Sequence, residues 1–204
     1  MRVGIDFDNT IISYDEVFRS VARDWGLIDD GVSARKQSIR DYIRLLPDGD
    51  VTWQRLQGHV YGKGISSARM FDGVDSFLSR CRSEGCAVSI VSHKTKFGHY
   101  DLDSVNLREA ALSWMEERGF FHDARYDIPI ENVYFEESRA AKLVRIAALD
   151  CTWFIDDLEE VLGDPAFPAD VAPILFSAGA MARGPFAAFH IWSDIEEHLF
   201  RDRQ

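Results

Sequence analysis

The sequence predicts an α/β protein: a doubly wound, mostly parallel sheet with a Rossmann-like core and an inserted small helical domain. Short apolar runs of strand length recur along the chain, and amphipathic stretches of helical period separate them. One stretch near the N-terminus contains helical patterns only. Near-continuous apolar strands that alternate with helices are typical of a parallel sheet covered on both faces. The 204 residues suffice for one domain with a modest insertion.

The predicted core consists of six apolar runs and the helices that connect them. The expected strands are Val3–Phe7, Ala87–Val91, Val133–Phe135, Thr152–Ile155, Pro173–Phe176 and Ala188–Ile191. The expected helices are Gly73–Arg82, Val105–Arg118, Arg139–Leu149, Leu158–Leu162 and Ile195–Phe200. The flanking residues agree with these bounds, since Ser104 and Gly119 are suitable caps for the second of these helices.

The stretch from about Ser13 to Met70 has no convincing strand and interrupts the alternation. It is predicted to form three helices, Tyr14–Trp25, Ala34–Leu46 and Thr52–Tyr61, separated by segments that contain proline and glycine. We therefore expect residues 1–12 and 71–204 to form the core. Residues 13–70 are expected to form a helical cap inserted directly after the first strand.

Composition and charge exclude several classes of protein. Three cysteines without a CxxC pair argue against a disulfide framework and a structural zinc site. A net charge of −11 disfavours nucleic acid and anionic membranes as partners. No apolar run approaches the length of a membrane span, and the start of the chain does not look like a signal peptide. We expect a cytoplasmic protein, and the sequence contains no signal for its oligomeric state.

Polar residues follow three of the predicted strands at the point where each strand ends. Asp6 and Asp8 follow the first strand, Ser92 follows the second, and Asp156 and Asp157 follow the fourth. Ligands bind at the carboxyl ends of the strands in open parallel sheets. Carboxylates this close together repel each other, and removing them from water is costly. A metal cation is the natural group to compensate for both effects.

These residues resemble, in type and order, the motif set of the haloacid dehalogenase superfamily. Asp6–Thr10, with the sequence DFDNT, looks like its DxDxT motif. Ser92 in IVSHK looks like its second motif, and Lys142 is the best match to its third, a basic residue. Asp156 and Asp157 in WFIDDLEEV look like its fourth, an acidic pair after an apolar strand. The helical insertion lies where this family places a small helical cap.

The resemblance implies a Mg²⁺-dependent phosphatase that acts on a small phosphorylated metabolite through an aspartyl-phosphate. Asp6 would be the nucleophile, and Asp8 would protonate the leaving oxygen and then deprotonate the attacking water. Lys142 would offset the charge between Asp6 and the phosphate. Ser92 and main-chain N–H groups near Phe7 and Asp8 would hold the phosphoryl oxygens.

The same resemblance implies a set of oxygen ligands for Mg²⁺. They would be a carboxylate oxygen of Asp6, the backbone carbonyl of Asp8 and an acid of the Asp156–Asp157 pair. Asp157 is the first choice for direct contact, with Asp156 beside it or behind it. The simpler interpretation of the pair is an N-cap of the helix Leu158–Leu162, and both roles are compatible.

Several further polar residues are candidates for substrate contact. His93, Lys94 and His99 lie in the segment that follows the second strand, and His93 is included among the expected phosphate-binding residues. His59, Tyr61 and Lys63 lie among glycines near the end of the insertion. A solvated surface loop is the alternative interpretation of both segments. Arg139, Lys94 and Lys96 are alternatives to Lys142 as the cation of the third motif.

The sequence leaves alternative functions open. A phosphomutase of the same family would keep the same motifs, and a phosphate- and metal-binding module without turnover would keep the same fold. A dehalogenase is disfavoured, because carbon–halogen cleavage needs neither Asp8 nor a metal. The sequence departs from the commonest phosphatase pattern at Asn9 and Asp156, where glycine is frequent. The identity of the substrate would depend on residues of the cap.

Overall fold

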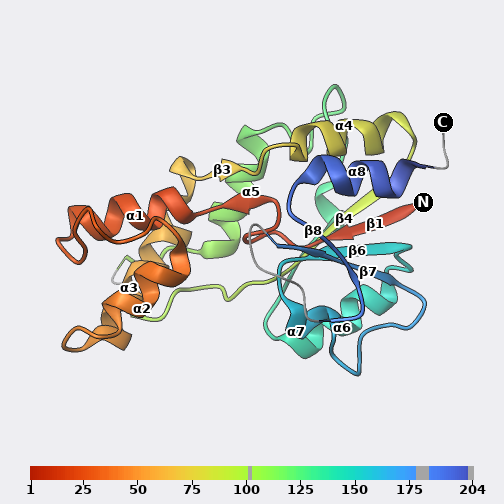
Figure 1. Cartoon of the computed structure of the whole chain (residues 1–204). Coiled ribbons are helices and arrows are strands. Elements are labelled where there is room, and N and C mark those ends of the chain that lie inside the picture. Colours follow the sequence, from red (N-terminus) through yellow and green to blue (C-terminus); the bar gives the residue numbers. More distant parts are fainter. Residues whose placement is uncertain (101–102, 178–183, 202–204) are drawn as a thin grey trace. The chain divides into compact units, whose positions relative to one another are not determined.

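The computed structural model describes residues 1–100, 103–177 and 184–201. The chain divides into two compact units, which are described separately here (Figure 1). The first unit comprises Met1–Ile12, Met70–His93 and Gly119–Gln204, and the second comprises Ser13–Arg69 and Lys94–Arg118. Each unit is therefore assembled from segments that are separated in the sequence.

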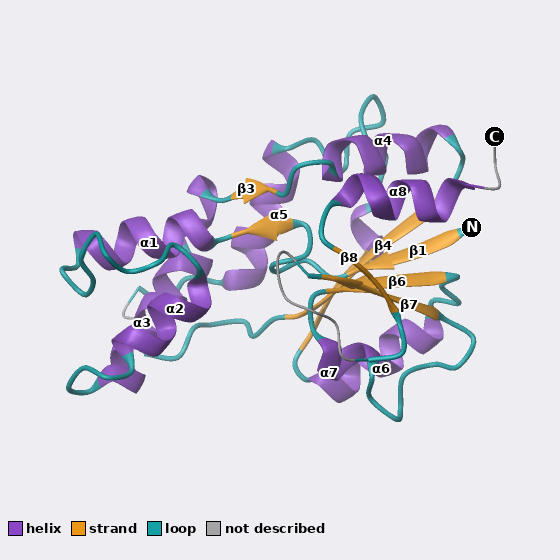
Figure 2. Cartoon of the chain, viewed as in Figure 1, coloured by secondary structure: helices purple, strands orange, loops and turns teal. Residues whose placement is uncertain are grey.

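The first unit contains a six-stranded sheet in which all paired neighbours are parallel. Its strands are β1 (Arg2–Ile5), β4 (Ala87–His93), β5 (Val133–Glu136), β6 (Trp153–Asp156), β7 (Ala172–Phe176) and β8 (Ala187–Phe189). The strand order is β5-β4-β1-β6-β7-β8 (Figure 2). From β1 the chain adds β4 and then β5 on one side, and it then returns to add β6, β7 and β8 on the other side of β1. This confirms the prediction of a doubly wound parallel sheet.

Helices cover both faces of this sheet, as expected for buried parallel strands. They are α4 (Val74–Ser83), α6 (Arg139–Ala148), α7 (Glu159–Leu162) and α8 (Trp192–Phe200), with a short 3₁₀ turn, η2 (Ile130–Asn132). Figure 2 shows α4 and α8 on one face and α6 and α7 on the other. Within the part of the chain that the structure describes, no helix is long and apolar enough to span a membrane.

The central strand β1 is packed tightly on both faces. Val3 and Ile5 have no exposed surface. Gly4 allows the ring of Phe154 to pack directly against the strand, because a Cβ at this position would come within 2.5 Å of that ring. The strand ends at Ile5, two residues earlier than predicted, so Phe7 lies in the turn that follows it. This early end places Asp6 at the rim of the sheet.

The second unit is helical. It contains α1 (Asp15–Asp24), α2 (Lys36–Ile43), α3 (Gly49–Tyr61), the 3₁₀ helix η1 (Lys63–Ser67) and α5 (Leu107–Glu117). The first three correspond to the three helices predicted for the insertion. Two short strands that the sequence does not predict, β2 (Ile12–Ser13) and β3 (Arg69–Met70), pair where the chain passes between the units. Two residues are too few to produce a recognisable alternating pattern.

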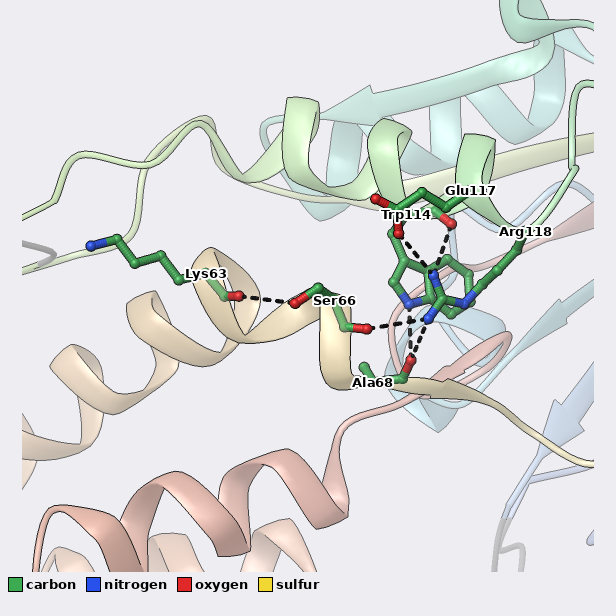
Figure 3. Close-up of polar contacts among 6 residues, drawn as sticks. All are labelled: Lys63, Ser66, Ala68, Trp114, Glu117 and Arg118. Carbon is green, nitrogen blue, oxygen red and sulfur yellow. Dashed lines mark hydrogen bonds and ion pairs between the residues drawn. The ribbon is translucent and has the colours of Figure 1, made fainter.

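The segment Lys94–Arg118 differs from the sequence-based domain boundaries, which assign it to the core. Its helix α5 packs against η1 and α3 of the second unit. The indole Nε1–H of Trp114 donates to the carbonyl of Ala68 over 3.0 Å (Figure 3). The Arg118 guanidinium donates to the carbonyls of Ser66 and Ala68 over 3.3 and 3.0 Å. The amphipathic pattern of α5 predicts a buried face, but it does not identify the helices that cover that face.

Candidate active site

The register of the sheet brings the functional strand ends to one edge. Ile5 of β1 is paired with Ile90 of β4 on one side and with Ile155 of β6 on the other. Asp6 follows Ile5, and Asp156 follows Ile155. Because Ile5 and Ile155 are paired, the two aspartates lie side by side at the ends of adjacent strands. This placement follows from parallel pairing, which aligns the carboxyl ends of neighbouring strands.

A buried ammonium group connects the two aspartates. The Nζ atom of Lys142 lies 2.6 Å from Oδ1 of Asp6 and 2.6 Å from Oδ2 of Asp156. Lys142, Asp6 and Asp156 are only 1%, 4% and 0% exposed. The lysine comes from α6, whose first turn is capped by the hydroxyl of Ser138, which accepts from the Ala141 N–H over 3.1 Å. Burying charges is costly, and this geometry offsets the cost with two charge-assisted hydrogen bonds.

The protonation states follow from burial and from these neighbours. Burial raises the pKa of Asp6 to about 7, with contributions from the negative charges of Asp156 and Asp8, and Lys142 opposes this rise. Burial alone would lower the pKa of Lys142. The charges of Asp6 and Asp156 outweigh that effect and raise the pKa of Lys142 above its ordinary value. The lysine therefore remains a cation, whereas Asp6 depends on further positive charge to be fully ionised at neutral pH.

The turn after β1 holds Asp6 from its other side. The hydroxyl of Thr10 donates to Oδ2 of Asp6 over 3.3 Å. The turn is closed by the carbonyl of Phe7, which accepts from the N–H groups of Ile11 and Ile12. Asn9 has a φ of 61°, a left-handed conformation that asparagine tolerates better than most residues. Asn9 can therefore adopt the left-handed conformation that this turn requires, although the motif that the sequence resembles frequently has glycine at this position.

Ser92 is a buried polar group whose hydroxyl is not satisfied. It is 1% exposed, and its Oγ atom has no hydrogen-bond partner among the described residues. Such orphaned groups are rare in folded proteins and are frequently functional. A phosphoryl oxygen is an acceptor for this hydroxyl, so the geometry fits the phosphate-binding role that the sequence predicts for Ser92.

The carboxylates of Asp6, Asp156 and Asp157 form a group that fits a hard cation. One oxygen from each lies within 4.8 Å of the other two. Oxygen donors of this kind suit Mg²⁺. Both Asp156 oxygens already accept hydrogen bonds, from Lys142 and from the Leu158 N–H, the latter over 2.9 Å. The two oxygens of Asp6 likewise accept hydrogen bonds, from Lys142 and from Thr10, so Lys142 is positioned by both aspartates.

The structure distinguishes between two of the cations that the sequence leaves open, Lys142 and Arg139. Arg139 lies on the same helix as Lys142, but its guanidinium forms surface ion pairs with Glu160 and Asp164 at 3.9 and 3.5 Å. Lys142 is the cation that touches both Asp6 and Asp156. The buried geometry therefore favours Lys142 over Arg139 for the role of the third motif.

The other predicted residues are placed differently. His93 is exposed, and its Nε2 atom lies 3.1 Å from the carbonyl of Glu137. It follows Ser92 on β4, so its side chain points to the opposite face of the strand. Asp8 is half-buried and forms a bridge with Ile12, near enough to Asp6 to raise its pKa. The structure therefore groups Asp8 with Asp6, whereas the contacts between described residues include none that joins His93 to either of them.

Two features of the site were missed by sequence reasoning. One is the contact of the Thr10 hydroxyl with Asp6, although the threonine of the DFDNT motif is itself a signal for it. The other is the double contact of Lys142, because no pattern in the sequence predicts that Asp156 shares this lysine with Asp6.

Comparisons with known proteins support the architecture. No protein-family model matches the sequence, and no curated protein matches it significantly. Among solved structures, a HAD-superfamily hydrolase from Ehrlichia chaffeensis is similar with a TM-score of 0.59 and 17% identity, over 100% of this chain and 97% of that one. The chain has the haloacid dehalogenase fold.

Two further structures that resemble this chain differ from each other in their named activity. A HAD family hydrolase from Deinococcus radiodurans, with bound phosphate and sodium, has a TM-score of 0.54 and 14% identity over 98% of this chain and 95% of that one. Mycobacterium tuberculosis Protein Tyrosine Kinase A has a TM-score of 0.60 and 13% identity over 97% of each chain. Since this chain is similar in structure to both a hydrolase and a kinase, its activity must be argued from the residues of the site.

Proposed function

We propose that this chain is a Mg²⁺-dependent phosphatase that hydrolyses a small phosphomonoester through an aspartyl-phosphate on Asp6. The observation that carries the proposal is the buried Lys142, which bridges Asp6 and Asp156 at the sheet edge with Asp157 within reach. In this arrangement Asp6 lies next to the buried cation of Lys142, and the three carboxylates supply oxygen ligands for a second cation, Mg²⁺. Phosphoryl transfer needs such positioning and charge neutralisation above all.

The first step is an attack by a carboxylate oxygen of Asp6 on phosphorus. A new O–P bond forms, the ester P–O bond breaks, and Asp8 donates a proton to the departing oxygen. In the second step Asp8 removes a proton from a water molecule, which attacks phosphorus and releases inorganic phosphate and the Asp6 carboxylate. Lys142 keeps its proton throughout and stabilises the anionic form of Asp6.

Mg²⁺ would be held by Asp6, the Asp8 carbonyl and Asp157, with Asp156 behind them, and when bound it would neutralise charge on the phosphoryl oxygens. Ser92 would donate its hydroxyl hydrogen to a phosphoryl oxygen. Main-chain N–H groups near Phe7 and Asp8 would hold the others. In this proposal the first unit does the chemistry and the helical unit acts as the cap that selects the substrate.

The proposal includes the partner that the sequence predicts, and the predicted location remains a prediction. A small phosphorylated metabolite is the expected substrate, and the net charge of −11 disfavours nucleic acid. The cytoplasmic location expected from the sequence stays a prediction. A phosphomutase is the alternative, because it would use the same Asp6 and Asp8 but return the phosphoryl group to a sugar. A non-catalytic phosphate- and metal-binding module would keep the ligands without turnover.

Phosphate release from a panel of phosphorylated metabolites tests the proposal. We expect release from a few compounds with Mg²⁺ and none after EDTA treatment. Asp157→Asn should raise the Mg²⁺ concentration for half-maximal activity by about tenfold or more, because it removes a charged oxygen ligand. Asp170→Asn, at an exposed acid of the same unit, is the matched control and should behave as the native protein. Activity that survives EDTA would refute the metal role, and Mg²⁺ binding without any release would favour the non-catalytic module.

Ser92→Ala separates a functional hydroxyl from a structural one. Because the Ser92 Oγ atom makes no hydrogen bond with the described residues, its loss should leave the melting temperature unchanged or slightly raised. The kcat/KM for phosphate release should fall by about 10- to 100-fold, since a hydrogen bond to a charged group contributes about 1.5–3 kcal/mol. Ser89→Ala in the same strand is the control. A destabilised Ser92→Ala protein with normal kcat/KM would contradict the phosphate-binding role.

A further inference from the structure

Two cysteines of the first unit lie on either side of the turn that joins α4 to β4, and the proposed function does not use them. Cys81 is in the last turn of α4, and Cys86 immediately precedes β4. Both are present as thiols. Cys81 is 0% exposed and Cys86 is 9% exposed, whereas residues 82–85 between them are all exposed. The two thiols therefore lie just beneath an exposed turn.

The turn after α4 has the hydrogen bonds of a Schellman motif. The N–H of Cys86 donates to the carbonyl of Cys81 over 2.8 Å, and the N–H of Gly85 donates to the carbonyl of Arg82 over 3.0 Å. Gly85 has a φ of 64°, the left-handed conformation that ends such a helix. In this motif the side chains at the positions of Cys81 and Cys86 are frequently in contact. The motif thus brings two cysteines together that are five residues apart in the sequence.

The same hydrogen bond limits the distance between the two backbones. A carbonyl oxygen lies about 2.4 Å from its own Cα atom, and an amide nitrogen lies about 1.5 Å from its own. With 2.8 Å between this oxygen and this nitrogen, the Cα atoms of Cys81 and Cys86 are at most about 6.7 Å apart. Disulfides join Cα atoms that are about 4.4–6.8 Å apart. The backbone therefore already has a separation that a disulfide can bridge.

The environment of Cys81 agrees with this proximity. Burial raises the pKa of the Cys81 thiol above its ordinary value, and the neighbouring Cys86 and Glu196 add to the rise. A buried thiol of this kind reacts slowly with a dissolved oxidant. Cys86 has the greater exposure, and its Sγ atom makes only a weak contact with the Glu84 carbonyl, at 4.0 Å. Cys86 is therefore the thiol that an oxidant in solution meets first.

We infer that Cys81 and Cys86 form an intramolecular disulfide when the protein meets a small disulfide such as oxidised glutathione. The Cys86 thiolate attacks one sulfur of the oxidant, forms a mixed disulfide and displaces one glutathione thiolate. Cys81 then loses its proton, attacks the Cys86 sulfur and displaces the second glutathione. Two protein thiols are oxidised, and the oxidant is reduced to two thiols that take up the two protons.

The bond ties the end of α4 to the start of β4, which pairs with the central strand β1. It closes a loop of only a few residues, so its effect on the unfolded chain is smaller than that of a bond across a long loop. Ser92 lies near the opposite end of β4, away from the bond. Oxidation therefore stabilises the first unit without reaching the candidate active site.

Peptide mapping of the oxidised protein tests the inference. The full-length native protein is incubated with oxidised glutathione, quenched in acid, alkylated and digested with trypsin without reduction. Trypsin cuts after Arg82, between the two cysteines, so the bond joins two tryptic peptides. We expect these joined peptides, no bond to Cys151, and a melting temperature about 3–8 °C above that of the reduced protein. Dithiothreitol should reverse both changes.

The matched control is Cys151→Ala, at a buried cysteine of the same unit, and it should form the bond as the native protein does. Cys81→Ala should retain one glutathione on Cys86, with no rise in melting temperature. Cys86→Ala, which should form no bond, keeps the comparison valid if Cys81→Ala does not fold. Folded native protein without the joined peptides, a bond to Cys151, or a lower melting temperature after oxidation overturns the inference. These readouts are independent of phosphate release.

Discussion

Asp6→Asn should reduce phosphate release by about 10⁴-fold or more, because the amide cannot serve as the nucleophile that forms the covalent intermediate. The substitution keeps the shape of the side chain and removes its charge. The asparagine keeps a carboxamide oxygen that can accept from the Thr10 hydroxyl, so the fold should be retained. Initial rates of phosphate release at saturating Mg²⁺, measured with the best substrate of the panel, provide the readout.

The control for this substitution is Asp170→Asn, which makes the same chemical change at an exposed position of the same unit. It should release phosphate at the native rate. Asp6→Asn should also bind substrate with an affinity near that of the native protein, since binding relies on Ser92 and the cations. Activity within tenfold of native would mean that Asp6 is not the nucleophile, and the two-step mechanism would then have to be abandoned.

Lys142→Met should lower both stability and activity. The methionine fills a similar volume but leaves Asp6 and Asp156 buried without their shared cation. Breaking a buried ion pair by removing one partner costs about 3–5 kcal/mol in the free energy of unfolding. Because the lysine also holds Asp6 ionised, the rate of phosphate release should fall by about 100-fold or more. Denaturant unfolding and initial rates measure the two effects.

The stability loss of Lys142→Met should depend on pH in a defined direction. Asp6 already has its pKa raised to about 7 by burial, and losing Lys142 raises it further. A carboxyl whose folded-state pKa lies above its unfolded value stabilises the fold at low pH, and this contribution is lost as pH rises through the folded pKa. The loss relative to native protein should therefore be greatest at about pH 8 and smaller at about pH 5, where Asp6 is protonated.

Arg139→Met on the same helix is the matched control for this prediction. Its guanidinium forms surface ion pairs with Glu160 and Asp164, so its replacement should cost less than about 1 kcal/mol and show little dependence on pH. Equal losses for Lys142→Met and Arg139→Met, or a Lys142→Met loss that grows as pH falls, would contradict the assigned geometry.

Much of the fold could be predicted from the sequence because its signals are local. Apolar runs such as RVGI and the helical repeat of residues 139–149 identify their own secondary structure. Polar residues at the carboxyl ends of parallel strands are expected at one edge of the sheet, and Asp6, directly after β1, and Asp156, the last residue of β6, do lie there. The three helices of the insertion were recognisable for the same reason.

The remaining features depend on contacts between distant segments, and the sequence does not encode these in a local pattern. The amphipathic face of α5 could have packed on the sheet, but Trp114 and Arg118 bind the carbonyl of Ala68 instead. His93 was expected near the phosphate, whereas the strand continues through it and turns its side chain to the other face.

The most direct test of the central claim is detection of a phosphoryl group on Asp6. Asp8→Asn should slow hydrolysis of the intermediate, whereas p-nitrophenyl phosphate, whose leaving group needs no proton, should still form it. After rapid mixing with Mg²⁺ and quenching in acid, mass spectrometry of the intact chain and its N-terminal peptide should find one added phosphoryl group on Asp6. This group should be absent with EDTA and in the Asp6→Asn, Asp8→Asn double variant. A phosphoryl group on another residue, or phosphate release by the native chain with no phosphorylated protein at any time, would contradict the account.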